Sequence, residues 1–285
     1  MTPDLGQLAV DVERHEASVW ASCFDAAAAT TGNPAGVIVD RSFEPPLAVA
    51  QAIDSVDVNR VLGLGMFSPA TPETIWAVAD FFASHGPSTF RIELAPVASP
   101  PHLEKELLDR VGLRRLEGTI TKKWGSVEHL PPPSTDVEVR LLGGEHRDEV
   151  AELNVRAWGA WEAAGPMKTW FGATVGTARF RHYGVFDGGR LVSVQALSVS
   201  GELGWVGFAA THPRYRGRFG RAINVVLLGD ARDLGCRFVH TEVETRYAAT
   251  KKSLLERLYD RTLYSSVPSR VPLPGRWVAS SGGDP

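Results

Sequence analysis

Apolar and polar positions in the first half of the chain alternate with the periods of helices and strands. Leu8, Val12 and Val19 recur at the spacing of one face of an amphipathic helix, and the Gly-Asn-Pro sequence at 32–34 ends that stretch. Apolar runs bounded by Gly, Pro and Ser residues indicate short strands after it. The first half is predicted to contain one or two helices over 5–29, helices over 72–84 and 102–111, and strands over 36–40, 59–65, 89–94 and 115–122.

Three apolar runs in the second half are separated by two glycine-containing turns, 187–189 and 200–202, whose sequences are typical of β-hairpins. These runs predict an antiparallel meander. The third run leads through a long amphipathic helix into another strand, which is the pattern of a βαβ unit. The second half is predicted to contain strands over 137–142, 182–186, 190–199, 203–211, 237–244 and near 263–267, and helices over 148–157, 166–171, 218–234 and 248–260.

A proline-rich stretch at 126–136 separates the two halves and is typical of a linker. The chain has 285 residues, which is long for one core and fits two domains of about 140 residues each. We therefore predict an α+β protein whose domains span 1–125 and 137–285. Each half is expected to hold a mixed, mostly antiparallel sheet flanked by helices.

Composition narrows the class of protein. Hydrophobic residues make up 44% and charged residues 22%, which indicates a globular chain, and the net charge of −3 makes a nucleic-acid partner unexpected. The two cysteines, Cys23 and Cys236, provide no disulfide framework, and the scattered histidines indicate no metal site. The N-terminus lacks the pattern of a signal peptide, and no run approaches the roughly 18 apolar residues of a membrane span. We expect a cytoplasmic protein without a membrane partner.

The segment 207–222 connects a predicted strand directly to a predicted helix and is rich in arginine. A helix that begins in this way exposes unpaired backbone N–H groups and the positive end of its dipole, which together favour an anion. The guanidinium groups of Arg214, Arg216, Arg218 and Arg221 add donors that suit phosphate. The alternative is a solvated basic surface, and the position between strand and helix favours a site for pyrophosphate.

These residues resemble the GNAT superfamily of acyl-CoA-dependent N-acyltransferases, in which a strand ends near Val-x-Pro and an Arg/Gln-x-x-Gly-x-Gly/Ala loop opens the next helix. Thr211-His212-Pro213 resembles the strand end, and 216–222 resembles the loop. The first half, with the sequences at 59–65, 81–82 and 92–96, looks like the degenerate first repeat of a tandem GNAT protein, and its segment 66–72 carries no cation. The resemblance implies acetyl-CoA as co-substrate at one site, without a metal. The implied contacts are Ala209, Ala210, Thr211, Arg216, Gly217, Arg218, Phe219, Gly220 and Arg221.

The loop departs from the family pattern. Aligned without a gap, Phe219 stands where the family has glycine, and Arg221 where it has glycine or alanine. Glycine suits that position because the backbone approaches phosphate closely. Phe219 is therefore expected to point away from the phosphate surface.

The strand over 237–244 supplies the candidate catalytic groups. Its period of two places His240, Glu242 and Glu244 on one face. In the family, a glutamate often takes the proton of the amine and a tyrosine often protonates the leaving thiolate. Glu242 and Glu244 are the candidate bases with His240 behind them, and Tyr247 is the substitute acid because Leu255 occupies the usual tyrosine position. An exposed strand face and a structural histidine are the alternative interpretations.

Aromatic residues follow the first strand of the second half. In the GNAT layout this region forms the wall of the acceptor pocket, so Trp158, Trp161 and Trp170 are candidate substrate contacts. Each of them is also explained by burial in the core.

The first functional hypothesis is transfer of an acetyl group from acetyl-CoA to a primary amine of a small molecule. The amine attacks directly, and a glutamate assists its deprotonation. Two alternatives remain: a non-catalytic protein that binds a ligand or acyl-CoA, and a tandem GNAT protein with another donor, such as aminoacyl transfer from a charged tRNA. Near-neutral charge disfavours the last one.

Overall fold

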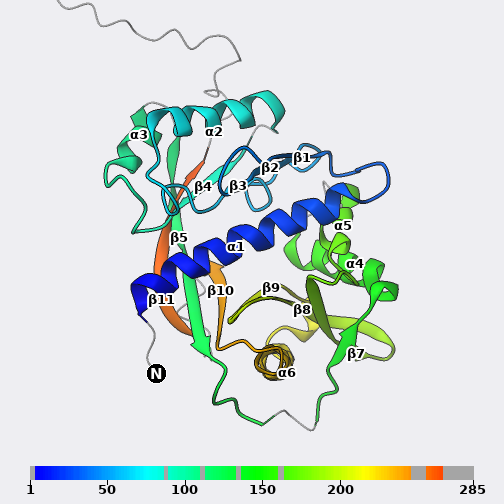
Figure 1. Cartoon of the computed structure of the whole chain (residues 1–285). Coiled ribbons are helices and arrows are strands. Elements are labelled where there is room, and N and C mark those ends of the chain that lie inside the picture. The colour runs from blue at the N-terminus through cyan, green and yellow to red at the C-terminus, as the bar shows by residue number, and fades with distance from the viewer. Residues whose placement is uncertain are drawn as a thin grey trace, which may run out of the picture.

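One nine-stranded sheet passes through both halves of the described chain, beside a separate two-stranded sheet (Figure 1). The computed structural model describes residues 4–86, 89–109, 113–132, 136–159, 164–244 and 255–265. The helices are α1 (Leu5–Ala28), α2 (Pro72–His85), α3 (Leu103–Asp109), α4 (Arg147–Trp158), α5 (Ala164–Ala173) and α6 (Gly220–Asp233). The strands are β1 (Val37–Asp40), β2 (Leu47–Ala50), β3 (Arg60–Val61), β4 (Arg91–Leu94), β5 (Arg114–Ser126), β6 (Arg140–Leu142), β7 (Phe180–Asp187), β8 (Arg190–Ser200), β9 (Leu203–Thr211), β10 (Phe238–Glu244) and β11 (Glu256–Ser265).

Local sequence accounts for the starts of the first two helices. The Asp4 carboxylate accepts hydrogen bonds from the backbone N–H groups of Gly6 and Gln7, which caps α1. The Thr71 hydroxyl accepts from the backbone N–H of Thr74, and proline follows at the first position of α2. The 24 residues of α1 form one helix that crosses the molecule between the upper and lower parts of Figure 1.

The sheet contains two parallel strand pairs, and two strands that the halves exchange lie between these pairs. β3 pairs parallel with β4, and β9 pairs parallel with β10. β5, from the first half, lies antiparallel to β10, while β11, from the second half, lies antiparallel to β4. β5 and β11 pair with each other at the centre. Each half therefore places one strand next to the parallel pair of the other half. The sheet continues past the predicted domain boundary.

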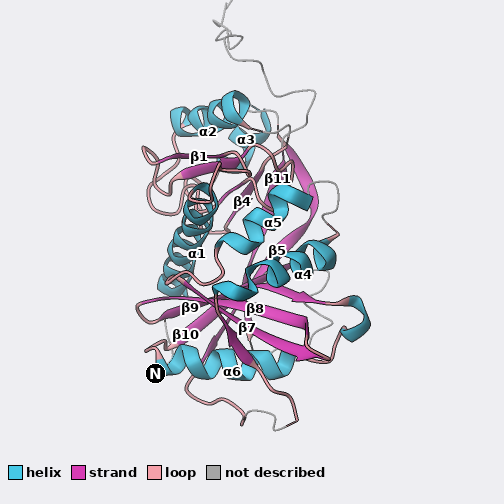
Figure 2. Ribbon diagram, turned by 90° about the vertical axis from the view of Figure 1, so that its right-hand side faces the viewer, coloured by secondary structure: helices cyan, strands magenta, loops and turns pink. Residues whose placement is uncertain are grey.

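Helices cover both faces of the lower part of the sheet (Figure 2). α6 packs against β7 and β8 on one face, whereas α1 and α4 pack against β9 on the opposite face, with α5 beside them. An aromatic cluster fills the space between α1, α5 and β9 and contains Trp20, Phe24, Trp170, Trp205 and Phe208. This arrangement confirms the predicted α+β class with a sheet flanked by helices.

Most predicted elements lie close to their observed positions, with four main differences. The predicted strand over 59–65 is observed only at Arg60–Val61, because a turn begins at Gly63. The predicted helix over 248–260 is wrong at its C-terminal end, because β11 begins at Glu256 and finds pairing partners on both of its edges. β2 was not predicted; it is a short buried run that pairs antiparallel with β1. β5 extends to Ser126, which is further than the predicted strand, because β10 continues the ladder.

Candidate functional site

The parallel strands β9 and β10 separate after a short paired stretch. Backbone pairing joins Leu203 to Phe238 and ends where Trp205 faces His240. One step further the Thr241 hydroxyl, rather than a backbone N–H, donates to the carbonyl of Val206 at 2.7 Å. Both strands continue beyond this point, so their C-terminal parts diverge.

β9 contains a β-bulge in its diverging part. Val194 on β8 faces Ala210 and Ala196 faces Gly207, so two residues of β9 lie opposite one residue of β8. One of the two, Phe208, has a φ of 48°, which is rare for a residue with a side chain. Because bulges re-aim side chains and interrupt pairing, β9 has an irregular backbone in the part that diverges from β10.

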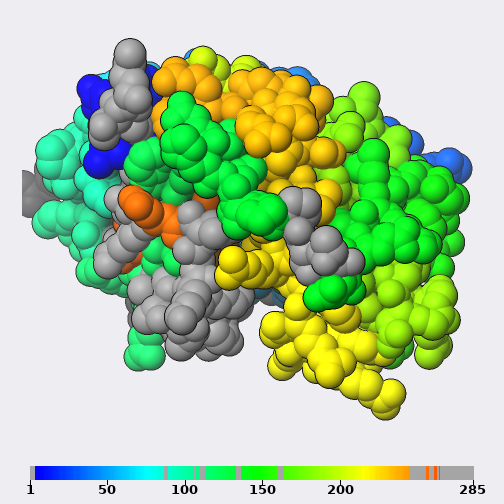
Figure 3. Space-filling model, turned by 90° about the horizontal axis from the view of Figure 1, so that it is seen from below, coloured from blue at the N-terminus to red at the C-terminus, as the bar shows by residue number. Residues whose placement is uncertain are grey.

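The arginine-rich turn lies at the end of β9 and leads into α6, as predicted. A short 3-10 helix, Pro213–Tyr215, is capped by the His212 ring nitrogen, which accepts from the backbone N–H of Arg214. Gly217 follows with a φ of 82°, a conformation that favours glycine, and α6 begins at Gly220. The turn projects from the surface as the yellow lobe of Figure 3.

The four arginines of this turn are exposed: Arg214, Arg216, Arg218 and Arg221. Within the described ranges, none of their guanidinium groups forms an ion pair. They stand at the N-terminus of a 14-residue helix, which is the positive end of the helix dipole. Positive side chains are unfavourable there unless an anion binds between them. An anionic partner would therefore stabilise the turn.

Phe219 points away from the exposed side of the turn. Its ring centre lies 5.8 Å from that of Tyr215, and both side chains pack against the apolar core beneath α6. The Tyr215 hydroxyl in turn donates to Asp187. The departure from the family pattern at Phe219 therefore adds apolar packing under the turn. At the next residue, Gly220, an added Cβ would meet no atom within 4 Å, so the space next to its backbone is open.

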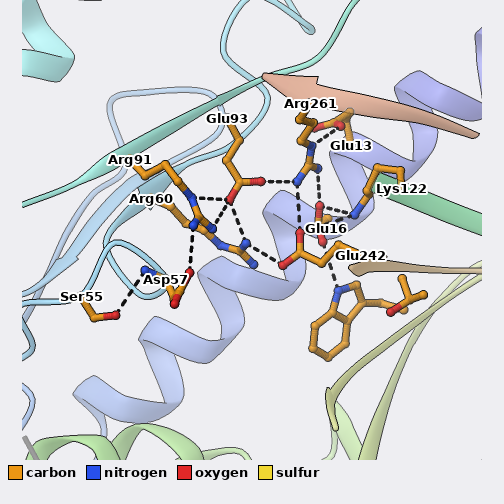
Figure 4. Close-up of polar contacts among 12 residues, drawn as sticks. Glu13, Glu16, Ser55, Asp57, Arg60, Arg91, Glu93, Lys122, Glu242 and Arg261 are labelled. Atoms are coloured by element: carbon orange, nitrogen blue, oxygen red, sulfur yellow. Dashed lines mark hydrogen bonds and ion pairs between the residues drawn. The ribbon is translucent and has the colours of Figure 1, made fainter. Parts of the chain in front are cut away.

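Glu242 lies on the diverging part of β10 within a buried ion cluster (Figure 4). Its carboxylate accepts from Arg60 at 2.6 Å and from Arg261 at 3.3 Å. The Glu242 side chain is 22% exposed, whereas those of the Arg60 and Arg261 partners are 2% and 0% exposed. The cluster consists of Glu13, Glu16, Arg60, Arg91, Glu93, Lys122, Arg261 and Glu242.

The cluster joins elements of both halves. α1 contributes two carboxylates, β3 and β4 contribute Arg60, Arg91 and Glu93, and β5 contributes Lys122, which donates to Glu16 at 2.5 Å. β10 and β11 add their members from the second half. Since a buried charge is costly unless it is paired, these ion pairs fix how the two halves meet.

The carboxylates of the cluster have different proton affinities. Burial alone would raise the pKa of Glu16, but Arg261 and Lys122 hold it well below the ordinary value. Burial raises the pKa of Glu242 despite the nearby Arg60, and the negative charges of Glu16 and Glu93 add to the rise. Glu242 is thus a partly exposed carboxylate with increased proton affinity, which is a property suited to a general base.

His240 is buried and hydrogen-bonded, so the structure gives it interior surroundings. Its Nε2 lies 2.9 Å from Nδ1 of His15 on α1. Burial is the main cause that lowers the pKa of His240 well below the ordinary value, and Lys122 lowers it further. The other ring nitrogen of each histidine has no hydrogen-bond partner among the described residues. A neutral pair therefore links the two halves beside the ion cluster.

Acidification should weaken the fold through these histidines. Burial lowers the pKa of His15 to about 4, while an unfolded histidine titrates near 6.5. Between these values the unfolded chain binds protons that the folded chain excludes, so stability is complete above about pH 6.5 and falls toward pH 4. Urea midpoints at about pH 7.5 and pH 5 measure the loss. His15→Gln should reduce the loss. The remainder is due to His240 and His182, because burial also lowers their pKa values. Equal midpoints at both pH values would contradict this.

The other predicted site residues differ in their surroundings. Trp158 is 48% exposed at the end of α4, while Trp170 is 1% exposed and its ring stacks on Trp20 at 5.6 Å. Trp170 therefore contributes to the core. The side chain of Glu244 and the residues Tyr247 and Trp161 lie outside the described part of the chain.

Sequence reasoning missed the partners of Glu242. Arg60, Glu93 and Lys122 were assigned to strands without a functional interpretation. A charged residue inside a short apolar strand, such as Arg60 or Glu93, is a signal that could have marked them, because such residues are buried only when paired. Their mutual contacts depend on the exchange of β5 and β11, which no local pattern predicts.

Among the described residues, no three His, Cys, Asp or Glu side chains are grouped so that they could hold a metal ion. None of the described helices combines the length and apolar character needed to span a bilayer.

By sequence, the chain matches no family model and no curated protein. Its structure resembles that of a GCN5-related N-acetyltransferase from Kribbella flavida at a TM-score of 0.52 and 13% identity, over 81% of this chain and 87% of the other. A functionally unknown conserved protein from Staphylococcus epidermidis gives 0.51 and 6% identity, over 77% and 83%. A tandem GNAT protein from the clavulanic acid biosynthesis pathway gives 0.49 and 19% identity, over 67% of each chain.

The similarity to the Kribbella flavida structure extends over most of both chains. It confirms the predicted GNAT fold.

Proposed function

We propose that this chain is an N-acyltransferase that moves an acetyl group from acetyl-CoA to a primary amine of a small molecule. The observation that carries the proposal is the arginine-rich turn between β9 and α6, placed where β9 and β10 diverge and where β9 is bulged. The GNAT fold supports the same function. Domains over 1–125 and 137–285 remain part of the proposal, joined by the shared sheet.

The turn would hold the pyrophosphate of acetyl-CoA. The backbone N–H groups at the start of α6 and the guanidinium groups of Arg216, Arg218 and Arg221 are suited to bind phosphate oxygens. The open space around Gly217 and Gly220 allows close approach to the backbone. Ala209, Ala210 and Thr211 on β9 would contact the cofactor beside this turn, with the thioester directed toward β10.

In the reaction the amine nitrogen forms a bond to the thioester carbonyl carbon, and the bond between that carbon and sulfur breaks. Glu242, directly or through one water, takes the proton that the amine loses. That proton passes finally to the departing thiolate, so amide and free thiol are the products. The structure offers Glu242 for this role because it is partly exposed and its pKa is raised.

Thiol release tests the function. Purified protein is incubated with acetyl-CoA and a panel of amines, and free thiol is followed together with the mass of the amide product. We expect release that depends on one class of amine. A thermal shift with CoA but no product would indicate a binding protein, and neither signal would refute the proposal.

Charge reversal in the turn should weaken binding of CoA. Arg216→Glu and Arg218→Glu each remove a donor to phosphate and add a repulsive charge, so we expect the Kd for CoA to rise about 10-fold or more. Both side chains are exposed, so thermal stability should stay unchanged.

Arg190→Glu on β8 is an exposed control outside the turn and should bind CoA as the wild type does. Unchanged affinity in both turn variants, measured by calorimetry, would place the pyrophosphate elsewhere.

A further inference from the structure

Arg60 is a buried arginine that uses only one of its three nitrogens. Nη1 donates to Glu93 at 2.9 Å and to Glu242 at 2.6 Å. Nε and Nη2 have no hydrogen-bond partner among the described residues, although the side chain is only 2% exposed. Burial would lower the pKa of Arg60, but the adjacent carboxylates raise it, so the group stays charged. Its remaining N–H groups therefore lack the acceptors that a buried donor requires.

The surroundings of Arg60 also contain an unused donor. The guanidinium carbon lies 3.7 Å from the centre of the Trp20 ring, and the Trp20 Nε1–H has no partner among the described residues. The Trp20 ring centre is 6.2 Å from that of Phe208, the bulged residue of β9. Arg60 is thus one aromatic ring away from the bulge, and it touches Glu242 on β10. Arg60 therefore lies near residues of both strands that diverge.

Charge balance indicates which acceptor these donors suit. The buried or mostly buried members of the ion cluster are the four carboxylates Glu13, Glu16, Glu93 and Glu242 and the four cations Arg60, Arg91, Lys122 and Arg261. Asp57 also pairs with Arg91, but its side chain is 51% exposed, so solvent screens its charge. A bound anion would leave the buried ion cluster with excess negative charge, which is costly. A neutral oxygen, such as a carbonyl, would satisfy the donors and keep the balance.

We propose that Arg60, from the first half of the chain, is a catalytic residue that donates a hydrogen bond through Nη2 or Nε to the carbonyl oxygen of the acyl thioester. The inference rests on the proposed function, because that function brings a neutral carbonyl to the place where β9 and β10 diverge. It also explains why a residue of the first half reaches the strand that carries Glu242.

The two contacts of Arg60 would act together during transfer. Attack by the amine places negative charge on the carbonyl oxygen, and the cation beside it stabilises that charge. At the same time Glu242 takes up a proton and loses its own negative charge. The cluster then has one positive charge in excess, which the oxyanion balances. The carbonyl re-forms when the thiolate leaves, and the bond pattern at Arg60 returns to its starting state.

A comparison of two ligands tests the carbonyl contact without an acceptor amine. S-ethyl-CoA has a CH₂ group in place of the carbonyl of acetyl-CoA. A charged donor on the carbonyl predicts that the wild type binds acetyl-CoA about 10-fold more tightly than S-ethyl-CoA. Arg60→Lys keeps one positive charge, but its single nitrogen replaces the three of the guanidinium group. Held by Glu93 and Glu242, that nitrogen leaves no donor at the positions of Nε and Nη2, so the ratio should fall to about 1.

Arg91→Lys is the matched control. Arg91 faces Arg60 on the neighbouring strand and also pairs with Glu93, but all three of its nitrogens have partners: Nε and Nη2 donate to Glu93 and Nη1 donates to Asp57. This variant should lose stability and retain the 10-fold ratio. If Arg60→Lys does not fold, the charge-balanced double variant Arg60→Gln/Glu242→Gln replaces it, again with an expected ratio of about 1.

The outcomes separate the inference from the proposed function. A wild-type ratio near 1, or a ratio of 10 that persists without Arg60, would overturn the role of Arg60 while binding of acetyl-CoA still stands. If the wild type binds neither ligand, the proposed function fails and the inference fails with it.

Discussion

Replacement of Glu242 by glutamine should reduce kcat about 100-fold or more while acetyl-CoA binds with unchanged affinity. Glutamine has nearly the same size and can still accept from Arg60, but it cannot take a proton from the amine, and a general base contributes about 100- to 10,000-fold. In the wild type, kcat/KM should rise with pH through a pKa above that of a free glutamate, because burial first and the nearby Glu16 and Glu93 charges raise the pKa of Glu242. Below that pKa the group is protonated and cannot act as base.

Glu93→Gln provides the control for this variant. Glu93 accepts from the same Arg60 nitrogen, but Arg60, Arg91 and Arg261 hold its pKa well below the ordinary value against the effect of burial, so it is a poor base. Both variants remove one carboxylate from the ion cluster, and thermal denaturation measures that shared effect. An equal loss of kcat in both variants, or no loss in Glu242→Gln, would show that Glu242 is not the base.

Replacement of Arg261 by methionine should reduce the free energy of unfolding by about 3–5 kcal/mol, because it leaves buried carboxylates without their counter-charge. Arg261 is fully buried on β11, and it donates to Glu13 at 2.8 Å, to Glu93 at 2.7 Å and also to Glu16. These partners come from the first half of the chain. The loss should therefore appear as separation of the two halves as well as lower stability, measured by urea denaturation and limited proteolysis.

Arg140→Met is the matched control for that variant. Arg140 forms a bidentate pair with Glu138 at 2.9 Å, but both side chains are more than half exposed. Exposed pairs contribute about 0–1 kcal/mol, so this change should be small. If Arg261→Met were as stable as Arg140→Met, the ion cluster would not hold the halves together.

Local patterns were sufficient for most elements of this fold and for its arginine-rich turn. Thr71-Pro72 marks the start of α2 because capping acts over three residues, and the turn before α6 is read from consecutive residues. Strand exchange could not be predicted in this way. β11 was assigned in part to a helix, since its strand character depends on β4 and β5, which lie far from it in sequence.

In the candidate site too, local patterns identified single residues but not the contacts between distant parts of the chain. Glu242 was identified from the period of one strand, but its ionic partners lie 19 to 182 positions away along the chain. The same applies to His240, whose role as a buried partner of His15 follows from the packing of α1 on the sheet. Contacts over such separations need the assembled structure, because no local pattern specifies them.

The number of acetyl-CoA molecules bound per chain tests the central claim most directly. The turn at 66–72 of the first half has no cation, whereas the turn between β9 and α6 has four arginines. Calorimetric titration of acetyl-CoA into the purified protein should give one site per chain. The site should be lost in the double variant Arg216→Glu/Arg218→Glu. Absence of binding, or one site that the double variant retains in full, would contradict the account.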